Sequence, residues 1–300
     1  MVKIIKQFSF LLAIVTFFNC TNNPFDNDEV STRGQKIKGT VALDDNASPN
    51  NVYVWLSGVE VGTFTDADGK FDLRLPTSNA QSGGGISGHF FLYFYVANYS
   101  LDSVSVAIRK GVVQTGQGGI NDNGELEKTI RLKKLLNVYI SASPTSFPYF
   151  TENSSIIQEY CDIYTGFEEP FVVLVDLTSL SNSLFIKFPN TTTGPASILF
   201  LENIKPDQQF TKRIAVSETI INSSLVSQEL NKEFRSWIGS FKLEADMLPP
   251  GQYRIIPYFF VQQNIVPQAL MESLYLSNNT PGLDFVNIPM KHNSIILEIK

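Results

Sequence analysis

The chain contains few side chains that act as nucleophiles or transition-metal ligands. It has two histidines, His89 and His292, and two cysteines, Cys20 and Cys161. A catalytic cysteine needs a nearby base or positive charge, and neither histidine is close to Cys161 in the sequence. We therefore interpret Cys161 as a small buried apolar residue.

Carboxylates are more numerous, but their spacing does not indicate a catalytic pair. A glycosidase needs two carboxyl groups at a defined separation. The candidates Glu168, Glu169 and Asp176 lie in or near presumed loops, and their spacing supports no such pair. We predict no catalytic residue, no metal site and no cofactor, and an enzyme is the least favoured class.

Asp66 and Asp68 could be read as the start of a calcium-binding loop. An EF-hand loop needs further oxygen ligands at fixed positions and a glutamate at its end. Counted from Asp66, those positions hold Lys70, Arg74 and Thr77. The segment Asp66–Gly69 instead predicts a hairpin turn, in which aspartates accept bonds from nearby backbone N–H groups and Gly69 supplies a positive φ.

The N-terminus has the pattern of an export signal. Lys3 and Lys6 precede the eleven-residue apolar run Phe8–Phe18. A membrane-spanning helix needs about 20 apolar residues, whereas a signal-peptide core has roughly 7 to 15. We therefore predict that residues 1–19 are a signal peptide.

The apolar run ends at Asn19-Cys20, and the sequence then becomes polar at once. This arrangement resembles the lipobox of bacterial lipoproteins, whose cysteine is acylated and becomes the mature N-terminus. Phe17, Phe18 and Asn19 replace the usual small residue before the cysteine, so the resemblance is to the looser lipoboxes of spirochaetes and Bacteroidetes. It implies lipid attachment at Cys20, and the alternative is an unmodified Cys20 in a leader.

A lipidated N-terminus would hold the protein on a membrane, because two or more acyl chains suffice for stable anchoring. Residues 20–35 are rich in Asn, Asp, Ser and Thr and would form a flexible tether. Thr21 is not the aspartate that retains lipoproteins in the inner membrane of enterobacteria, which favours the outer membrane of a bacterial cell envelope, on its periplasmic or its surface face. Cys161 would then have no partner for an intramolecular disulfide.

Composition indicates a globular β-rich protein. The 300-residue chain is 43% hydrophobic and 17% charged, with 23 Phe and 11 Tyr, which favour strands. Its formal net charge of −6 disfavours nucleic acid as a partner, since phosphate binding needs a basic face. The short basic cluster Arg131–Lys134 is most simply the solvated end of a strand.

Residues 36–134 predict a first β-sandwich domain. Short runs separated by turn signals indicate about seven strands, and Lys70–Leu75 alternates apolar and charged residues as a half-buried strand does. The runs are Lys36–Leu43, Val52–Leu56, Thr63–Thr65, Lys70–Leu75, His89–Ala97, Ser103–Arg109 and Glu125–Leu132.

Three segments, Ile37–Val41, Val52–Leu56 and Thr65–Leu73, resemble the carboxypeptidase regulatory-like family. The most specific piece is the Thr-Asp-x-x-Gly-x-Phe turn within Thr65–Leu73. The resemblance implies a transthyretin-like (prealbumin-like) Greek-key sandwich and no chemistry. The zinc peptidase domain for which the family is named needs a His-x-x-Glu, and neither His89 nor His292 is followed by such a Glu, which excludes that activity.

Residues 135–300 predict a second β-rich domain, an Ig-like or similar sandwich, which resembles no family that we identify. Apolar runs of strand length recur through it. Two segments, Ser155–Tyr164 and Leu225–Phe234, have the capping or spacing expected of short helices. The predicted strands are Leu136–Ala142, Phe171–Leu177, Leu184–Phe188, Ile198–Ile204, Phe210–Val216, Ile238–Ala245, Tyr253–Val261 and Ser294–Ile299.

Two predicted strands, His89–Val96 and Ile255–Val261, are apolar or aromatic on both faces. A two-layer sandwich leaves one face to water, so a second contact must cover these strands. We expect the face made by Phe91, Tyr93 and Tyr95 to pack against the second domain. The alternative is an exposed patch that binds a glycan, a peptide or a partner protein.

These features favour a non-enzymatic, membrane-anchored envelope lipoprotein with a binding or structural role. One alternative is an accessory subunit of an envelope uptake or secretion complex, and a glycan- or peptide-processing enzyme is less favoured. The expected partners are the membrane, through the lipid, and an unknown envelope protein or glycan.

Overall fold

The computed structural model describes most of the chain beyond the predicted tether. The described ranges are 34–76, 85–116, 118–149, 171–181, 184–191, 194–195, 198–204, 211–214, 225–232, 234–241, 248–274 and 287–300. Cys20, Cys161 and the predicted helix Ser155–Tyr164 lie outside them. Nearly all of the regular secondary structure in the described chain is strand, which confirms the predicted all-β class.

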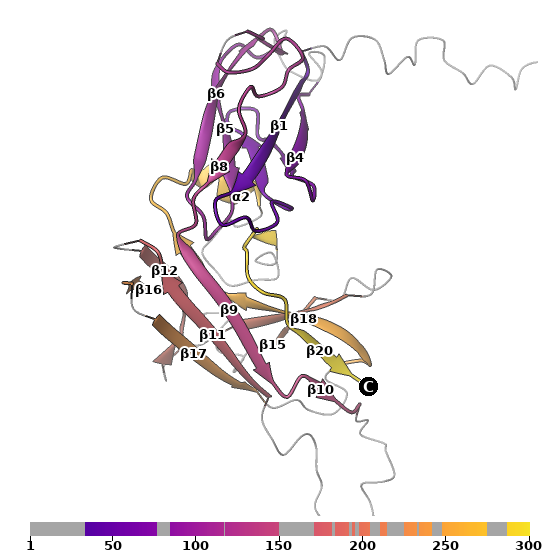
Figure 1. The fold of residues 1–300 in the computed structure, drawn as a ribbon, viewed down its shortest axis with the longest axis vertical. Helices are drawn as coiled ribbons and strands as arrows, with labels where there is room; N and C mark the ends of the chain where they lie inside the picture. The colour runs from indigo at the N-terminus through magenta and orange to yellow at the C-terminus, as the bar shows by residue number, and fades with distance from the viewer. Residues whose placement is uncertain are drawn as a thin grey trace, which may run out of the picture.

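The first unit, defined as the described residues between 34 and 134, consists of two sheets (Figure 1). One sheet has the strand order β4-β1-β8, and the other has the order β3-β2-β5-β6-β7. β1 pairs antiparallel with β4 and parallel with β8, whereas the pairs of the five-stranded sheet are antiparallel. The strands are β1 (Lys36–Leu43), β2 (Tyr53–Leu56), β3 (Val61–Phe64), β4 (Lys70–Arg74), β5 (Gly88–Tyr95), β6 (Asp102–Arg109), β7 (Val112–Val113) and β8 (Ile130–Leu132).

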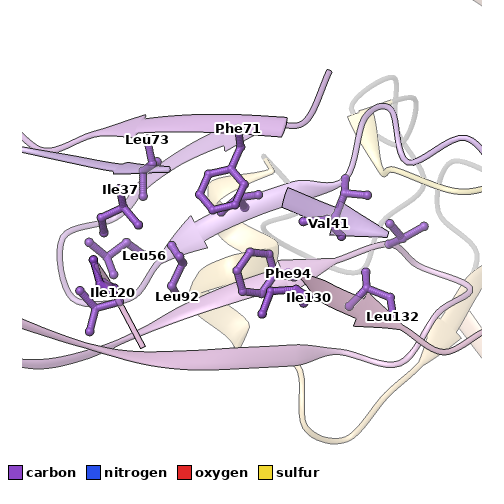
Figure 2. Close-up of a cluster of buried hydrophobic side chains, with 14 of the residues drawn as sticks. Ile37, Val41, Leu56, Phe71, Leu73, Leu92, Phe94, Ile120, Ile130 and Leu132 are labelled. Atoms are coloured by element: carbon purple, nitrogen blue, oxygen red, sulfur yellow. The ribbon is translucent and has the colours of Figure 1, made fainter. Parts of the chain in front are cut away.

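The core of the first unit lies between its two sheets. Alternation along β4 turns Phe71 and Leu73 inward, while the charged residues of the strand remain exposed. Figure 2 shows Phe71 and Phe94 pointing toward one another from opposite sheets, and their rings lie edge to face with centroids 5.8 Å apart. Full burial of each such side chain contributes about 1.5–3 kcal/mol.

The turn Asp66–Gly69 has the predicted hydrogen bonds. Asp66 Oδ1 accepts bonds from the backbone N–H of Asp68 at 2.9 Å and of Lys70 at 2.8 Å. Gly69 has φ +77°, and a Cβ there would lie 2.1 Å from the Val41 carbonyl oxygen. The segment is therefore confirmed as a turn, but the predicted hairpin is wrong: β3 pairs with β2 and β4 pairs with β1, so the turn carries the chain from one sheet to the other.

The second unit, the described residues between 135 and 300, holds three further sheets. Their strand orders are β10-β20-β18-β14-β15, β17-β11-β9 and β13-β12-β16, and β19 also pairs with β12. The strands are β9 (Leu136–Ser143), β10 (Ser146–Phe147), β11 (Phe171–Ser179), β12 (Leu184–Thr191), β13 (Gly194–Pro195), β14 (Ile198–Asn203), β15 (Thr211–Ile214), β16 (Leu225–Leu230), β17 (Phe234–Phe241), β18 (Gly251–Tyr258), β19 (Phe260–Gln262) and β20 (Ile296–Ile299).

The core of the second unit contains residues from most of these strands. Along the chain, its first residue is Leu136 and its last is Ile299. The chain passes from the first core to the second between Leu132 and Leu136. The domain boundary between residues 134 and 135 stays a prediction.

The predicted helix Leu225–Phe234 is wrong. This segment forms β16 and the start of β17, and β16 pairs antiparallel with β12 along its whole length. Leu225, Leu230 and Phe234 fall near one face of a helix, but a run this short fits a strand equally well. Backbone pairing with β12 decides the outcome, and it places Leu230 in the core opposite Leu184.

Side-chain amides join the two units. Asn98 is fully buried and donates through Nδ2 to the carbonyl oxygens of Leu136 at 3.1 Å and Lys291 at 2.8 Å, and its Oδ1 accepts from Lys291 N at 3.0 Å. Gln263 Nε2 donates to the carbonyls of Ala97 and Tyr99, at 3.1 and 2.7 Å. Such bonds satisfy buried backbone groups that would otherwise be costly.

Lys134, at one end of the basic cluster Arg131–Lys134, contacts other side chains and is not fully solvated. Lys134 Nζ lies 2.8 Å from Asp45 Oδ2 and 5.8 Å from the centroid of the Tyr99 ring. The Tyr99 hydroxyl also donates to the Asp45 carboxylate at 2.9 Å. Arg131 and Lys133 are exposed, as predicted for a strand end.

Candidate functional site

The outer face of the five-stranded sheet carries a set of aromatic side chains. β5 turns Leu92 and Phe94 into the core, so Phe91, Tyr93 and Tyr95 lie on the opposite face. β2 and β3 extend this set through cross-strand pairs. We call the whole set the aromatic face, and its members are Tyr53, Trp55, Phe64, Phe91, Tyr93 and Tyr95.

One end of the aromatic face is covered by a short helix from the second unit, α2 (Gln268–Ser273), which Figure 1 shows among the strands of the first unit. Tyr53, Trp55 and Tyr95 are buried in one cluster with Leu270 and Leu274. Burial of its hydroxyl raises the pKa of Tyr95, so this side chain stays neutral.

Tyr53 adds a polar contact to this cover. Its hydroxyl lies 3.0 Å from Ser273 Oγ, which itself donates to the Leu270 carbonyl at 2.6 Å. Because the serine proton is committed to that carbonyl, the tyrosine hydroxyl is the donor of the pair. Gly62 faces the same ring, and a Cβ there would lie 2.3 Å from the Tyr53 hydroxyl oxygen. The glycine therefore leaves room for the ring.

The other end of the aromatic face is open. Phe91 is 51% exposed and Tyr93 is half-buried. The Phe91 and Tyr93 rings are 6.0 Å apart, and Tyr93 lies 5.9 Å from Trp55, which is 1% exposed. The rings thus form a continuous series from the covered end to solvent, with spacings at which aromatic pairs attract one another.

Serine hydroxyls border the open end. Ser105 lies opposite Phe91 and Ser103 lies opposite Tyr93 on the neighbouring β6, and both serines are exposed. On the other side, Ser57 Oγ accepts the backbone N–H of Phe91 at 2.9 Å. A hydroxyl that accepts one bond still has a proton to donate, so each serine can bond a ligand that stacks on the rings.

Trp55 has a buried polar group without a partner. Within the described residues, its Nε1 is the one buried side-chain nitrogen or oxygen that has no hydrogen bond. A buried, unsatisfied donor costs about 1–3 kcal/mol. The indole lies beside Tyr93, at the boundary between the covered and open ends.

The two histidines lie in different parts of the described structure. His89 is exposed near the start of β5, whereas His292 lies beside the junction, and burial lowers its pKa. Within the described ranges, no three His, Cys, Asp or Glu residues are close enough together to hold a metal ion. In the same ranges, no helix has the length and apolar character to span a bilayer.

The three residues predicted for the aromatic face do share one face of β5, but they differ in how far they are covered. Tyr95 lies under α2, Tyr93 lies at the boundary and Phe91 lies in the open part. Sequence reasoning missed Tyr53, Trp55 and Phe64. The spacing of Tyr53 and Trp55, two residues apart in a strand, was a signal that both share a face.

The sequence matches no family model and no curated protein. Among solved structures, a protein named as a candidate carbohydrate binder from Bacteroides uniformis is 9% identical, with a TM-score of 0.35 over 77% of this chain and 91% of that one.

Two pilins align less well. The major pilin subunit of Bacillus cereus is 8% identical, with a TM-score of 0.22 over 88% of this chain and 69% of its own. The shaft pilin of Lactobacillus rhamnosus GG is 9% identical, with a TM-score of 0.24 over 88% and 97%. At these scores, none of the three structures guides an inference about function.

Proposed function

We propose that this chain is a lipid-anchored protein of the bacterial cell envelope with a non-enzymatic binding role, and that Phe91 and Tyr93 contact its ligand. The observation that carries the proposal is the open end of the aromatic face. The cluster that includes α2 buries Trp55 and leaves Tyr93 half-buried against it, and beyond them Phe91 is 51% exposed. An exposed ring that continues a buried aromatic series provides a stacking surface.

The hydroxyls beside the rings favour a saccharide as the ligand. A sugar ring has a flat C–H surface that stacks on an aromatic ring, and hydroxyls at its edge that form hydrogen bonds. Ser57, Ser103 and Ser105 border Phe91 and Tyr93 and can donate or accept such bonds. We therefore favour a recognition role over the alternative of an accessory subunit with a fixed protein partner.

The lipid anchor is the second part of the proposal. It depends on Cys20 and on the polar stretch of residues 20–35, which precedes β1 and would separate the folded part from the membrane surface. The outer membrane is the proposed location, because the residue after the cysteine, Thr21, is not the aspartate that retains lipoproteins in the inner membrane of enterobacteria.

Intact mass after detergent extraction from membranes tests the anchor. The expected species begins at Cys20 and carries acyl chains, and Cys20→Ala should yield a soluble, unacylated chain. A mature chain that begins at Thr21, or one without acyl groups, would refute anchoring.

Binding of the full-length, detergent-purified chain to a glycan array tests the ligand. We expect Phe91→Ala to weaken binding at least tenfold, which corresponds to about 1.4 kcal/mol. Phe185→Ala is the matched control, because this phenylalanine on β12 is also exposed but lies in the second unit. Unchanged binding by Phe91→Ala would contradict the proposal. A stoichiometric protein that co-purifies only with intact Phe91 would support the accessory subunit instead.

A further inference from the structure

A second exposed surface lies on the β17-β11-β9 sheet of the second unit. The inner face of this sheet packs Val138, Ile140, Val175 and Leu177 into the core. Two neighbouring rows lie on the other face, and we call them the second platform. One row is Tyr139, Asp176 and Ser236, and the next is Asn137, Thr178 and Phe234.

Two exposed rings occupy opposite corners of the second platform. Phe234 is 61% exposed and Tyr139 is 57% exposed, which makes them the most exposed aromatic side chains in the described part of the chain. They lie on the two outer strands of the sheet and one row apart. Standard strand spacings place their Cα atoms about 12 Å apart along a diagonal.

Hydrogen-bonding groups fill the surface between the rings. Ser236 Oγ donates to Asp176 Oδ1 at 2.7 Å, which orients the carboxylate. A carboxylate has about four acceptor positions, so Asp176 can accept further bonds. Thr178 adds a half-buried hydroxyl, and Asn137 adds an exposed amide that both donates and accepts.

We propose that the second platform binds a neutral oligosaccharide that extends across the three strands. Two separated rings can stack on the C–H faces of different sugar units, and the groups between them can bond to the sugar hydroxyls. The one ionisable carboxylate of the platform, Asp176, would repel an anionic ligand, so a neutral saccharide fits its charge.

The size and shape of the second platform argue against a protein partner. A stable protein interface buries about 800 Å² and roughly 20–30 residues on each side, with an apolar centre. The second platform has six residues, four of them polar, and they lie side by side on a sheet. It therefore suits a ligand that is recognised by stacking and hydrogen bonds.

The second platform is independent of the aromatic face, because the two share no residue and lie on different sheets. Either surface can bind without the other. If both bind the same polysaccharide, the second contact becomes intramolecular and the overall affinity rises well above that of each site.

Affinity electrophoresis of the full-length, detergent-purified chain in gels that contain dextran, soluble starch or galactomannan tests this inference. We expect retardation in at least one neutral polysaccharide. Tyr139→Ala and Phe234→Ala should each reduce the association constant at least fivefold. All changes are to exposed side chains, so circular dichroism and thermal unfolding should stay close to those of the unaltered protein.

The variants separate this inference from the proposed function. Loss of binding in Tyr139→Ala and Phe234→Ala, with Phe185→Ala unchanged, supports the second platform. Loss in Phe91→Ala alone supports the aromatic face and overturns the second platform. Absence of retardation in all three neutral polysaccharides, or retardation by alginate alone, also overturns it.

Discussion

Asn98 provides a direct measure of how strongly the two units are coupled. Its buried amide forms three hydrogen bonds, to the carbonyl oxygens of Leu136 and Lys291 and from the backbone N–H of Lys291. Each such bond contributes about 0.5–1.5 kcal/mol net. Asn98→Ala removes all three and leaves buried backbone groups unpaired, so we expect the free energy of unfolding to fall by about 3 kcal/mol.

Urea unfolding, followed by the fluorescence of Trp55 and Trp237 together and by circular dichroism, measures this change. With an m-value of about 3 kcal/mol/M, the midpoint should fall by about 1 M. Asn123→Ala is the matched control, because Asn123 is exposed and its change should stay within about 0.5 kcal/mol. A loss below about 1 kcal/mol for Asn98→Ala would refute the reasoning, because the amide bonds would then contribute little to the junction.

Three further predictions concern the cover, a buried histidine and a turn. Leu270→Ala, made in a Trp237→Phe background so that Trp55 is the one tryptophan, should lower the free energy of unfolding by about 2–5 kcal/mol and shift the emission to the red, because it opens a cavity over the indole; unchanged emission would contradict this packing. Burial lowers the pKa of His292 from 6.5, and the nearby charges of Arg254 and Lys291 lower it further. The hydrogen bond to the Asn293 carbonyl opposes this shift. The unfolded chain then takes up the proton first, so stability falls as pH drops below about 6.5. His292→Gln should flatten this dependence in thermal unfolding between pH 8 and 5; an unaltered slope in His292→Gln would assign it to other groups. Gly69→Ala should lower the melting temperature, because φ +77° is strained for alanine and its Cβ would meet the Val41 carbonyl; an unchanged melting temperature would show that the turn can rearrange.

Local patterns were sufficient to predict most of the first unit. Lys70–Leu75 alternates strictly, so its strand and inward face followed from the sequence, and β4 covers Lys70–Arg74. Asp66 and Gly69 likewise indicated the turn, because their side-chain and backbone preferences act within a few residues. The shared face of Phe91, Tyr93 and Tyr95 followed from the two-residue period of a strand.

The cover of the aromatic face could not be predicted in the same way. α2 has six residues, follows Pro267 without a side-chain cap and has no acidic residue in its first turn, so it lacks the usual signals of a helix. Its position over Trp55 depends on contacts between residues far apart in the sequence. The register of β9, β11 and β17, which creates the second platform, is also non-local, since β11 and β17 pair residues such as Asp176 and Ser236.

The position of α2 near the end of the chain has a consequence for biogenesis. Tyr53, Trp55 and Tyr95 are synthesised well before Leu270 and Leu274, which cover them. At about 5–20 residues per second, the nascent first unit would wait roughly 10 to 35 seconds for its cover. During that time the nascent chain would present an uncovered aromatic surface, and a chaperone that shields such surfaces would raise its yield.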